Sequence, residues 1–309
     1  MKKRDFYFES SDKVHKLHGL AWIPDHVKGI VQIVHGMCEY VDRYDRFAYF
    51  LCNHDLLVVG HDHLGHGKSV LNEEELGYFH EGDGSSYLID DIHQLQMLVK
   101  EKYPNLPYFM LGHSMGSFLA REYLMLYGKE LKGCIIMGTG TTPNNALNFG
   151  MNLIKAMAKV RGWSHRSDFV ANLAMGSYNN SFKPNRTPYD WLTRNEEIVD
   201  RYAEDPLDNY TMTIEGFYTM MCIIKSIQSP KHIRQLPKNV PLLIVSGAKD
   251  PVGDFGHGPL EVYIAYRKHG VKDIQMKLYP GARHEILNEL DHEVTDHDLL
   301  FWIEKRLKD

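Results

Sequence analysis

The chain has 309 residues, of which 43% are hydrophobic and 24% are charged, and it contains 25 glycines and 13 prolines. This composition excludes collagen-like, intrinsically disordered and disulfide-scaffold proteins. The net charge of −5 argues against a nucleic-acid site that works by neutralising phosphates.

Five short apolar runs punctuate the chain, and we predict that they form a parallel β-sheet. They do not alternate apolar with polar residues, so both faces of each strand should be covered by helices. The runs are Ile30–Val34, Leu56–Val59, Tyr108–Leu111, Cys134–Met137 and Leu242–Val245.

Other elements flank these runs. Phe6–Phe8 and Leu17–Trp22 are predicted to add an antiparallel edge, and Ile274–Leu278 a last strand. From Ser85 to Tyr103 apolar residues recur at helical spacing, which predicts an amphipathic helix, and a terminal helix is expected over 293–307. Strands that alternate with helices predict an α/β fold with a mostly parallel central sheet flanked by helices.

The alternation stops between about residues 143 and 232. This stretch has no obvious buried strand and is rich in aromatic residues and methionine at helical spacings. We predict that 143–232 is a helical cap, or lid, inserted into an α/β core formed by 1–142 and 233–309. The alternative is that these helices only enlarge the core.

The strongest chemical signal is the pentapeptide Gly112–Gly116, which reads G-H-S-M-G. It follows the predicted strand Tyr108–Leu111 and precedes a predicted helix, Ser117–Tyr127. A turn this tight strains the central serine and leaves room only for hydrogen at the two glycines. It also exposes the hydroxyl beside a helix N-terminus, where free N–H groups favour negative charge. Ser114 is the predicted nucleophile; the alternative is an incidental serine in a glycine-rich turn.

A serine hydroxyl needs a neighbouring base to take its proton. Asp250 follows the predicted strand Leu242–Val245, and His284 follows the last predicted strand, so both should reach the carboxyl edge of the sheet. The chain order Ser114, Asp250, His284 is that of an α/β-hydrolase triad. We favour this pair over Asp254 and His257, which lie in the next loop.

Catalysis by such a triad also needs donors for a tetrahedral oxyanion. The backbone N–H of Met115, directly after the nucleophile, is one predicted donor. The loop after Ile30–Val34 should supply the other from the N–H of Met37, because Gly36 permits the required turn.

The histidine-rich segment His61–Gly67 raises the alternative of a zinc site. Such sites also need histidines and carboxylates on later strands, and no second cluster appears. We therefore expect no metal and no cofactor, and we assign the segment to a loop packed beside the nucleophile.

These motifs together resemble the α/β-hydrolases of the monoacylglycerol lipase, lysophospholipase and serine-aminopeptidase-like group. The resemblance covers about residues 5–142 and 235–307, and it implies carboxylic ester hydrolysis through an acyl-enzyme. The matching blocks are His35-Gly36 with Glu39 and Tyr44, Asp62–Ser69, Gly112–Gly116, and Asp250 with Gly281 and His284. The cap resembles that of bacterial members often labelled lysophospholipases, notably in Phe182–Thr187 and Asp190–Leu192.

The first functional hypothesis is a serine esterase acting on a small-molecule ester, an acyl lipid such as a monoacylglycerol or lysophospholipid, or a related carboxylester. Six methionines between residues 143 and 232 suit a pliable apolar pocket. The residues expected to bind substrate are His113, Phe217, Met220 and Met221.

Two alternatives remain. One is an aminopeptidase of the proline iminopeptidase type, which needs a cap carboxylate for the substrate's ammonium group. The candidates for that carboxylate are Glu196, Glu197, Glu204 and Glu215. The other alternative is a non-catalytic binding protein on a hydrolase scaffold.

The cysteines and the lengths of the hydrophobic runs indicate where in the cell the protein is expected. Cys38, Cys52, Cys134 and Cys222 are scattered without metal-like spacing, which is typical of a reducing compartment. No apolar run approaches the roughly 20 residues needed to cross a bilayer, and no signal peptide is recognised at the N-terminus. We expect a cytoplasmic protein without nucleic-acid partners; the sequence does not indicate its oligomeric state.

Overall fold

The computed structural model describes residues 1–308. Eight strands within these residues form a single sheet. The strands run in the order β1-β2-β4-β3-β5-β6-β7-β8. β1 and β2 add an antiparallel edge, and the strands from β4 to β8 pair in parallel, so the predicted fold class is confirmed. The bounds are β1 Lys2–Glu9, β2 Lys16–Ile23, β3 Gly29–Val34, β4 Leu56–His61, β5 Tyr108–His113, β6 Gly133–Met137, β7 Leu242–Gly247 and β8 Ile274–Tyr279.

The unbroken apolar runs are buried on both faces, as predicted. In β3, Ile30 and Val34 belong to one hydrophobic cluster, while Val31 and Ile33 belong to a second cluster on the opposite face. Burying each such side chain contributes about 1.5–3 kcal/mol, so the two clusters fix the strands between their helix layers.

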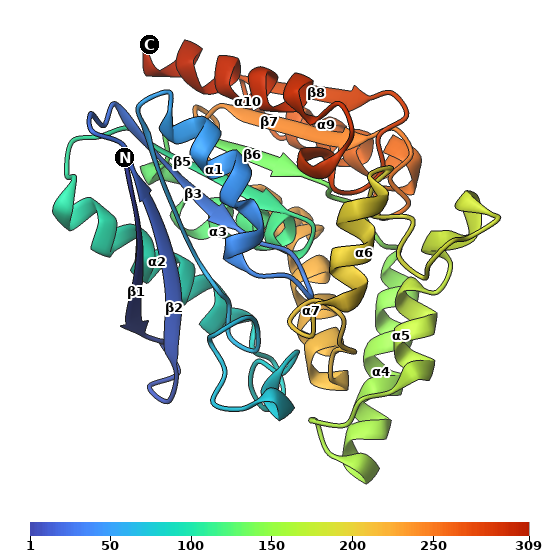
Figure 1. The fold of residues 1–309 in the computed structure, drawn as a ribbon. Coiled ribbons are helices and arrows are strands. Elements are labelled where there is room, and N and C mark those ends of the chain that lie inside the picture. Colours follow the sequence, from blue (N-terminus) through green and yellow to red (C-terminus); the bar gives the residue numbers. More distant parts are fainter. Residues whose placement is uncertain (309) are drawn as a thin grey trace.

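Helices cover both faces of the sheet (Figure 1). Side chains of α1 and α10 complete one hydrophobic cluster, and those of α2, α3 and α9 complete the other. The predicted helices are found, with α3 starting two residues earlier than expected. The bounds are α1 Asp45–Cys52, α2 Ser85–Lys102, α3 Met115–Tyr127, α4 Asn144–Arg161, α5 Asp168–Met175, α6 Glu196–Glu204, α7 Ile214–Ile227, α8 Pro230–Ile233, α9 His257–Lys268 and α10 His292–Leu307.

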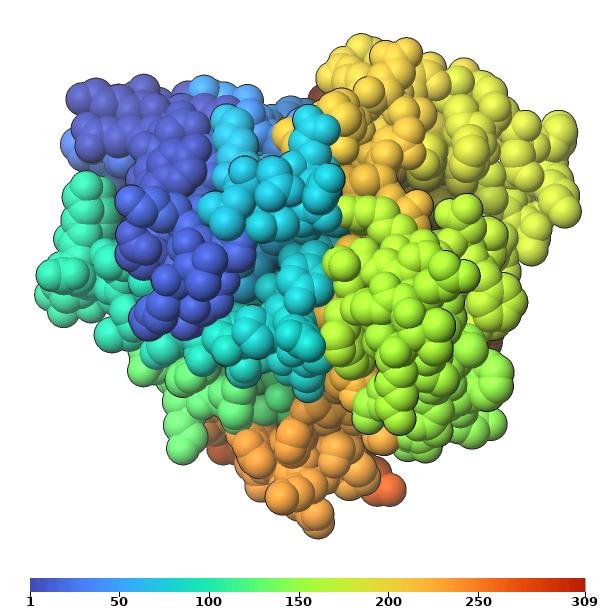
Figure 2. Space-filling model, turned by 90° about the horizontal axis from the view of Figure 1, so that it is seen from below, coloured from blue at the N-terminus to red at the C-terminus, as the bar shows by residue number. Residues whose placement is uncertain are grey.

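The chain between β6 and β7 carries helices α4 to α8. α4, α5 and α6 lie to one side of the sheet in Figure 1, and Figure 2 shows them in green to yellow beside the blue and cyan N-terminal residues. α7 packs against α3, and Thr213, the N-cap residue directly before α7, donates through Oγ1 to Gly77 O at 2.7 Å. None of the helices within residues 1–308 is long and apolar enough to cross a membrane.

Candidate active site

The Gly112–Gly116 segment makes a sharp turn from β5 into α3. Ser114 has φ 52° and ψ −120°, a positive-φ conformation that non-glycine residues rarely adopt. The Ser114 N–H donates to Met137 O at 3.0 Å, and the Ser117 hydroxyl donates to Ser114 O at 2.6 Å. These contacts hold the strained turn and leave the Ser114 side chain half-buried at the start of α3.

Close packing explains the two flanking glycines. A methyl group on Gly116 would collide with Val34 O at the end of β3, and one on Gly112 would collide with Gly116 O. Only hydrogen fits at either position, so the glycines let the turn approach the neighbouring strand.

The Asp250 carboxylate holds the His284 imidazole. His284 Nδ1 lies 3.0 Å from both Oδ atoms of Asp250, which also accepts from Ser246 Oγ at 3.0 Å and from Val252 N at 2.9 Å. Both residues are buried in loops that follow β7 and β8. Burial acts to raise the pKa of Asp250, but His284 and the hydrogen-bond donors hold that pKa below its usual value.

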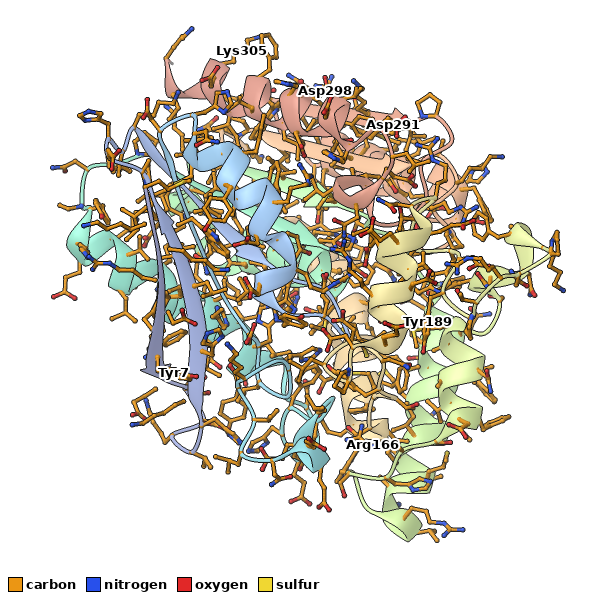
Figure 3. The ribbon with its side chains drawn as sticks, in the orientation of Figure 1. Tyr7, Arg166, Tyr189, Asp291, Asp298 and Lys305 are labelled. Atoms are coloured by element: carbon orange, nitrogen blue, oxygen red, sulfur yellow. The ribbon has the colours of Figure 1, made fainter. Side chains whose placement is uncertain are left out.

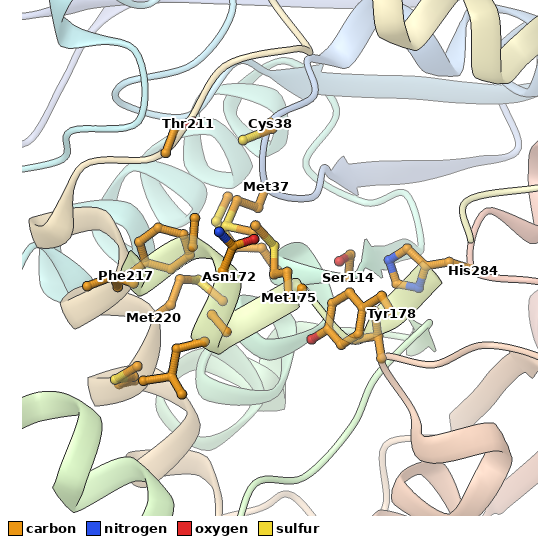
Figure 4. A pocket seen from close by; sticks show the side chains of 18 of the residues that line it. Met37, Cys38, Ser114, Asn172, Met175, Tyr178, Thr211, Phe217, Met220 and His284 are labelled. Carbon is orange, nitrogen blue, oxygen red and sulfur yellow. The ribbon is translucent and has the colours of Figure 1, made fainter. Parts of the chain in front are cut away.

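The His284 imidazole lies beside the Ser114 side chain at the wall of a cavity (Figure 4). The ring packs between His113 and Trp191, with centroid separations of 4.8 Å and 5.2 Å. Gly138 leaves room for the imidazole ring, because a methyl group on Gly138 would lie 3.1 Å from His284 Cε1. The structure therefore brings together the three residues predicted as a triad.

The two competing residues lie elsewhere. Asp254 and His257 are exposed, and neither lines the cavity that contains Ser114 and His284.

The loop after β3 lies against the nucleophile. A methyl group on Gly36 would come within 3.0 Å of Ser114 Cβ, and Met37 and Met115 both line the cavity. Met115 is the first residue of α3, where backbone N–H groups have no partner inside the helix. The backbone of both predicted oxyanion donors therefore lies close to Ser114.

The buried carboxylate of Glu39 holds the loop after β3 through several hydrogen bonds. It accepts hydrogen bonds from Gly36 N, from Tyr44 Oη at 2.8 Å and from Arg43 Nη1 at 3.0 Å, and it lies 3.0 Å from His113 Nδ1. Burial acts to raise the pKa of Glu39, but the cationic neighbours hold it well below its usual range. Glu39 in turn raises the pKa of His113 against the opposing effect of burial.

The cavity beside Ser114 has a volume of about 540 Å³, within the range of ligand pockets in proteins. Its wall is largely apolar, and helices α4, α5 and α7 supply most of the apolar side chains. These include Phe217, Met220 and Met221, three of the residues predicted to bind substrate. Figure 4 shows Phe217, Met220 and Met175 along the cavity from Ser114. His113, the fourth, also lines the cavity, but its Nδ1 is engaged by Glu39.

Sequence reasoning selected only part of this wall. Of the six cap methionines, Met175, Met220 and Met221 line the cavity, whereas Met151, Met157 and Met212 do not. Several polar wall residues were missed, because their side chains come from distant segments and form no local motif. They are Arg43, Asp208, Tyr178, Tyr202 and Tyr189, the last labelled beside α6 in Figure 3.

The carboxylates proposed to hold a substrate ammonium are wrongly placed for that role. Glu196, Glu197 and Glu204 are exposed, and none of them lines the cavity. Glu215 is buried, but its carboxylate accepts from Phe79 N at 2.7 Å and from Thr219 Oγ1 at 2.5 Å, away from the cavity.

The histidines of His61–Gly67 are packed as a neutral cluster. His63 N donates to His35 Nε2 at 2.9 Å, and the His35 and His63 rings lie 4.1 Å apart. Burial lowers the pKa of His61 and of His66 to about 3. Within residues 1–308, no group of three or more His, Cys, Asp and Glu side chains is arranged to hold a metal ion.

Comparison with known proteins agrees with this geometry. A family model described as serine aminopeptidase, S33, matches residues 25–291. The chain belongs to this family.

Relatives of this family member include two lipases. The chain is 28% identical over 287 residues to the monoacylglycerol lipase of Mycolicibacterium smegmatis, covering 93% of this chain and 92% of the relative. It is 29% identical over 287 residues to human monoglyceride lipase, covering 90% of this chain and 83% of the human protein. Among solved structures, a carboxyl esterase from Bacillus coagulans in complex with glycerol superposes with a TM-score of 0.90 at 29% identity, covering 99% of each chain.

The family, the relatives and the solved structures identify this chain as a carboxylic ester hydrolase with the α/β-hydrolase fold. The resemblance drawn from the sequence motifs is thereby confirmed.

Proposed function

We propose that this hydrolase cleaves esters of a single acyl chain, such as monoacylglycerols or lysophospholipids, through a serine acyl-enzyme. The observation that carries the proposal is a largely apolar cavity of about 540 Å³ whose wall includes both Ser114 and His284. Such a wall suits an acyl chain, since each buried methylene contributes about 0.8 kcal/mol. The two relatives named as lipases of monoacylglycerol or monoglyceride support the same substrate class.

In the proposed first step, Ser114 Oγ attacks the ester carbonyl carbon while His284 Nε2 takes the hydroxyl proton. Asp250 keeps the other ring nitrogen, Nδ1, protonated and stabilises the imidazolium, which the 3.0 Å contacts between Nδ1 and the carboxylate support. The backbone N–H groups of Met37 and Met115 donate to the oxyanion.

The intermediate collapses when His284 gives its proton to the departing alcohol, which leaves the acyl group on Ser114. Water then attacks the acyl-enzyme, again with His284 as base, and the fatty acid leaves. The acyl group stays in the apolar cavity while water replaces the alcohol. We propose that Phe217, Met220 and Met221, which line this cavity, bind the acyl chain and that His113 lies beside its carbonyl.

We also propose that 143–232 acts as a cap on a core of 1–142 and 233–309. Support comes from α4, α5 and α7, which supply most of the apolar wall although the catalytic side chains come from loops of the core. A cytoplasmic location is proposed from the cysteines, all four of which are free thiols.

A substrate panel with a nucleophile variant tests the proposed function. Wild type and Ser114→Ala are assayed on 1-monoacylglycerol, lysophosphatidylcholine, p-nitrophenyl esters and a prolyl β-naphthylamide. The proposal expects Ser114-dependent release of fatty acid from at least one lipid and little cleavage of the amide. A clear preference for the amide would replace the esterase by an aminopeptidase. The absence of Ser114-dependent turnover of any ester would remove the proposal.

A further inference from the structure

The imidazole of His284, the proposed base, is one of four aromatic rings in a row. The centroid of the Trp191 ring lies 5.2 Å from that of His284 and 5.1 Å from that of Tyr178. The centroids of His284 and His113 lie 4.8 Å apart. Tyr178 and His284 both line the cavity beside Ser114 (Figure 4). His113 belongs to β5, whereas Trp191 and Tyr178 come from the chain between β6 and β7.

Residues 190–193 of that chain run beside the loop that carries His284. Two carbonyl groups of this segment accept hydrogen bonds, one from His284 N at 3.4 Å and the other from Glu285 N at 2.7 Å. Its two other carbonyl groups accept from the guanidinium of Arg283. The chain between β6 and β7 therefore holds the backbone around His284 as well as contacting its ring.

Both neighbours of the imidazole are themselves held in place. The N–H of Trp191 donates to Asn179 Oδ1 at 3.0 Å, and the Trp191 ring also packs on Tyr178. The Nδ1 atom of His113 lies 3.0 Å from the carboxylate of Glu39. The imidazole therefore lies between two rings that cannot easily move, one of them in the core and the other in the chain between β6 and β7.

The Asp250 carboxylate by itself does not fix the orientation of the imidazole. Both of its oxygens lie near one ring atom, Nδ1 of His284, so the ring can still turn about that contact and carry Nε2 away from Ser114. Packing against the ring is what opposes this rotation. Proton transfer needs Nε2 within hydrogen-bond reach of the hydroxyl, about 2.6–3.2 Å. A displacement of about 1 Å can cost about 10² in rate.

We infer that Trp191 is a positioning residue for the proposed base, because its ring keeps the imidazole of His284 turned toward Ser114. The inference rests on the proposed function and adds to it. The chain between β6 and β7 then acts on the proton transfer as well as lining the acyl site. Since Trp191 also lines the cavity, its effect on the base has to be separated from contact with the substrate.

The test compares wild type and Trp191→Ala on two esters that differ only in acyl length. kcat and KM are measured for p-nitrophenyl acetate and p-nitrophenyl decanoate, with circular dichroism to show that the variant is folded. Acylation and deacylation use the same base, so kcat should fall by about 10² on both esters. KM for the acetate should stay within about threefold of wild type, because substrate binding is not affected.

Two further variants control this comparison. Trp191→Phe keeps an aromatic ring beside the imidazole, and it should recover at least about tenfold of the loss. Trp163→Ala is the matched control, because it loses the same side chain from the chain between β6 and β7. The Trp163 ring packs on Tyr218, and neither residue lines the cavity, so this variant should keep the wild-type kcat on both esters.

A loss confined to the decanoate overturns the inference, because Trp191 would then be only a wall of the acyl site. Unchanged kcat in Trp191→Ala, an equal loss in Trp163→Ala, or no recovery in Trp191→Phe overturns it as well. Activity that survives in His284→Ala is a different outcome, because it removes the proposed function. An active Trp191→Ala beside an inactive His284→Ala removes only the positioning role.

A second measurement uses the wild type and decides the matter if Trp191→Ala does not fold. Histidine is labelled with ¹³C at Cε1, and the His284 resonance is assigned by its absence in His284→Ala. We expect a nuclear Overhauser effect between ring protons of His284 and Trp191, and an order parameter for the imidazole of about 0.85, as in rigid backbone. The absence of that contact, or an order parameter below about 0.6, overturns the inference.

Discussion

Replacing Asp250 by asparagine keeps the shape of the side chain and removes the charge that faces His284. During catalysis the imidazole becomes a cation at a site where the Asp250 and His284 side chains are 0% and 2% exposed. With Nδ1 3.0 Å from the carboxylate and an effective dielectric constant of about 20, the lost attraction is about 5 kcal/mol. That energy corresponds to a loss of about 10⁴ in rate, which agrees with the loss of about 10⁴ in a serine protease with the same substitution.

The assay is kcat/KM for a p-nitrophenyl ester, with circular dichroism to show that each variant is folded. We expect Asp250→Asn to lose about 10⁴ in activity and His284→Ala to lose more, because the second change removes the base itself. Asp254→Asn is the matched control, since Asp254 is exposed and outside the cavity. Activity of a folded Asp250→Asn within tenfold of wild type, or an equal loss in Asp254→Asn, would refute the assignment.

Two further predictions concern the cavity and the histidine cluster. Phe217→Ala and Met220→Ala should move the optimum of p-nitrophenyl ester hydrolysis to longer acyl chains, whereas Val160→Ala, exposed on α4, should not; an unchanged profile in all three would contradict the proposed acyl site. His61→Gln tests how the free energy of unfolding depends on pH. The pKa of His61 is about 3 in the folded chain and about 6.5 in the unfolded chain, so near pH 5 only the unfolded chain carries a proton on this imidazole. The advantage of wild type over His61→Gln in free energy of unfolding, measured with urea, should shrink by about 2 kcal/mol from pH 7 to 5; a constant difference would contradict the neutral cluster.

The core of the fold was predictable because its signals are local. The apolar run Tyr108–Leu111 indicates a strand buried on both faces. The two glycines around Ser114 form a recognisable pattern within five consecutive residues, although Gly116 is required by its contact with Val34 O of β3. Asp250 and His284 could be selected because the carboxyl ends of parallel strands share one edge of the sheet.

The polar wall of the cavity was not predictable in this way. Arg43 and Glu285 are 242 residues apart in the chain, and Asp208 joins them from a third segment, so no spacing in the sequence connects them. The cap methionines show the same limit. Met151 and Met220 both have helical spacing, but only the packing of α4 against α7 decides that Met220 faces the cavity and Met151 does not.

The central claim is that Ser114 carries the acyl group, and trapping that intermediate tests it most directly. Wild type is mixed with a p-nitrophenyl ester, quenched with acid during turnover, digested and analysed by peptide mass spectrometry, with Ser114→Ala as control. We expect a mass increase of one acyl group on the peptide that contains Gly112–Gly116, absent in Ser114→Ala, together with a loss of activity on the order of 10⁶ in that variant. An acyl group on another residue, or turnover that survives in Ser114→Ala, would contradict it.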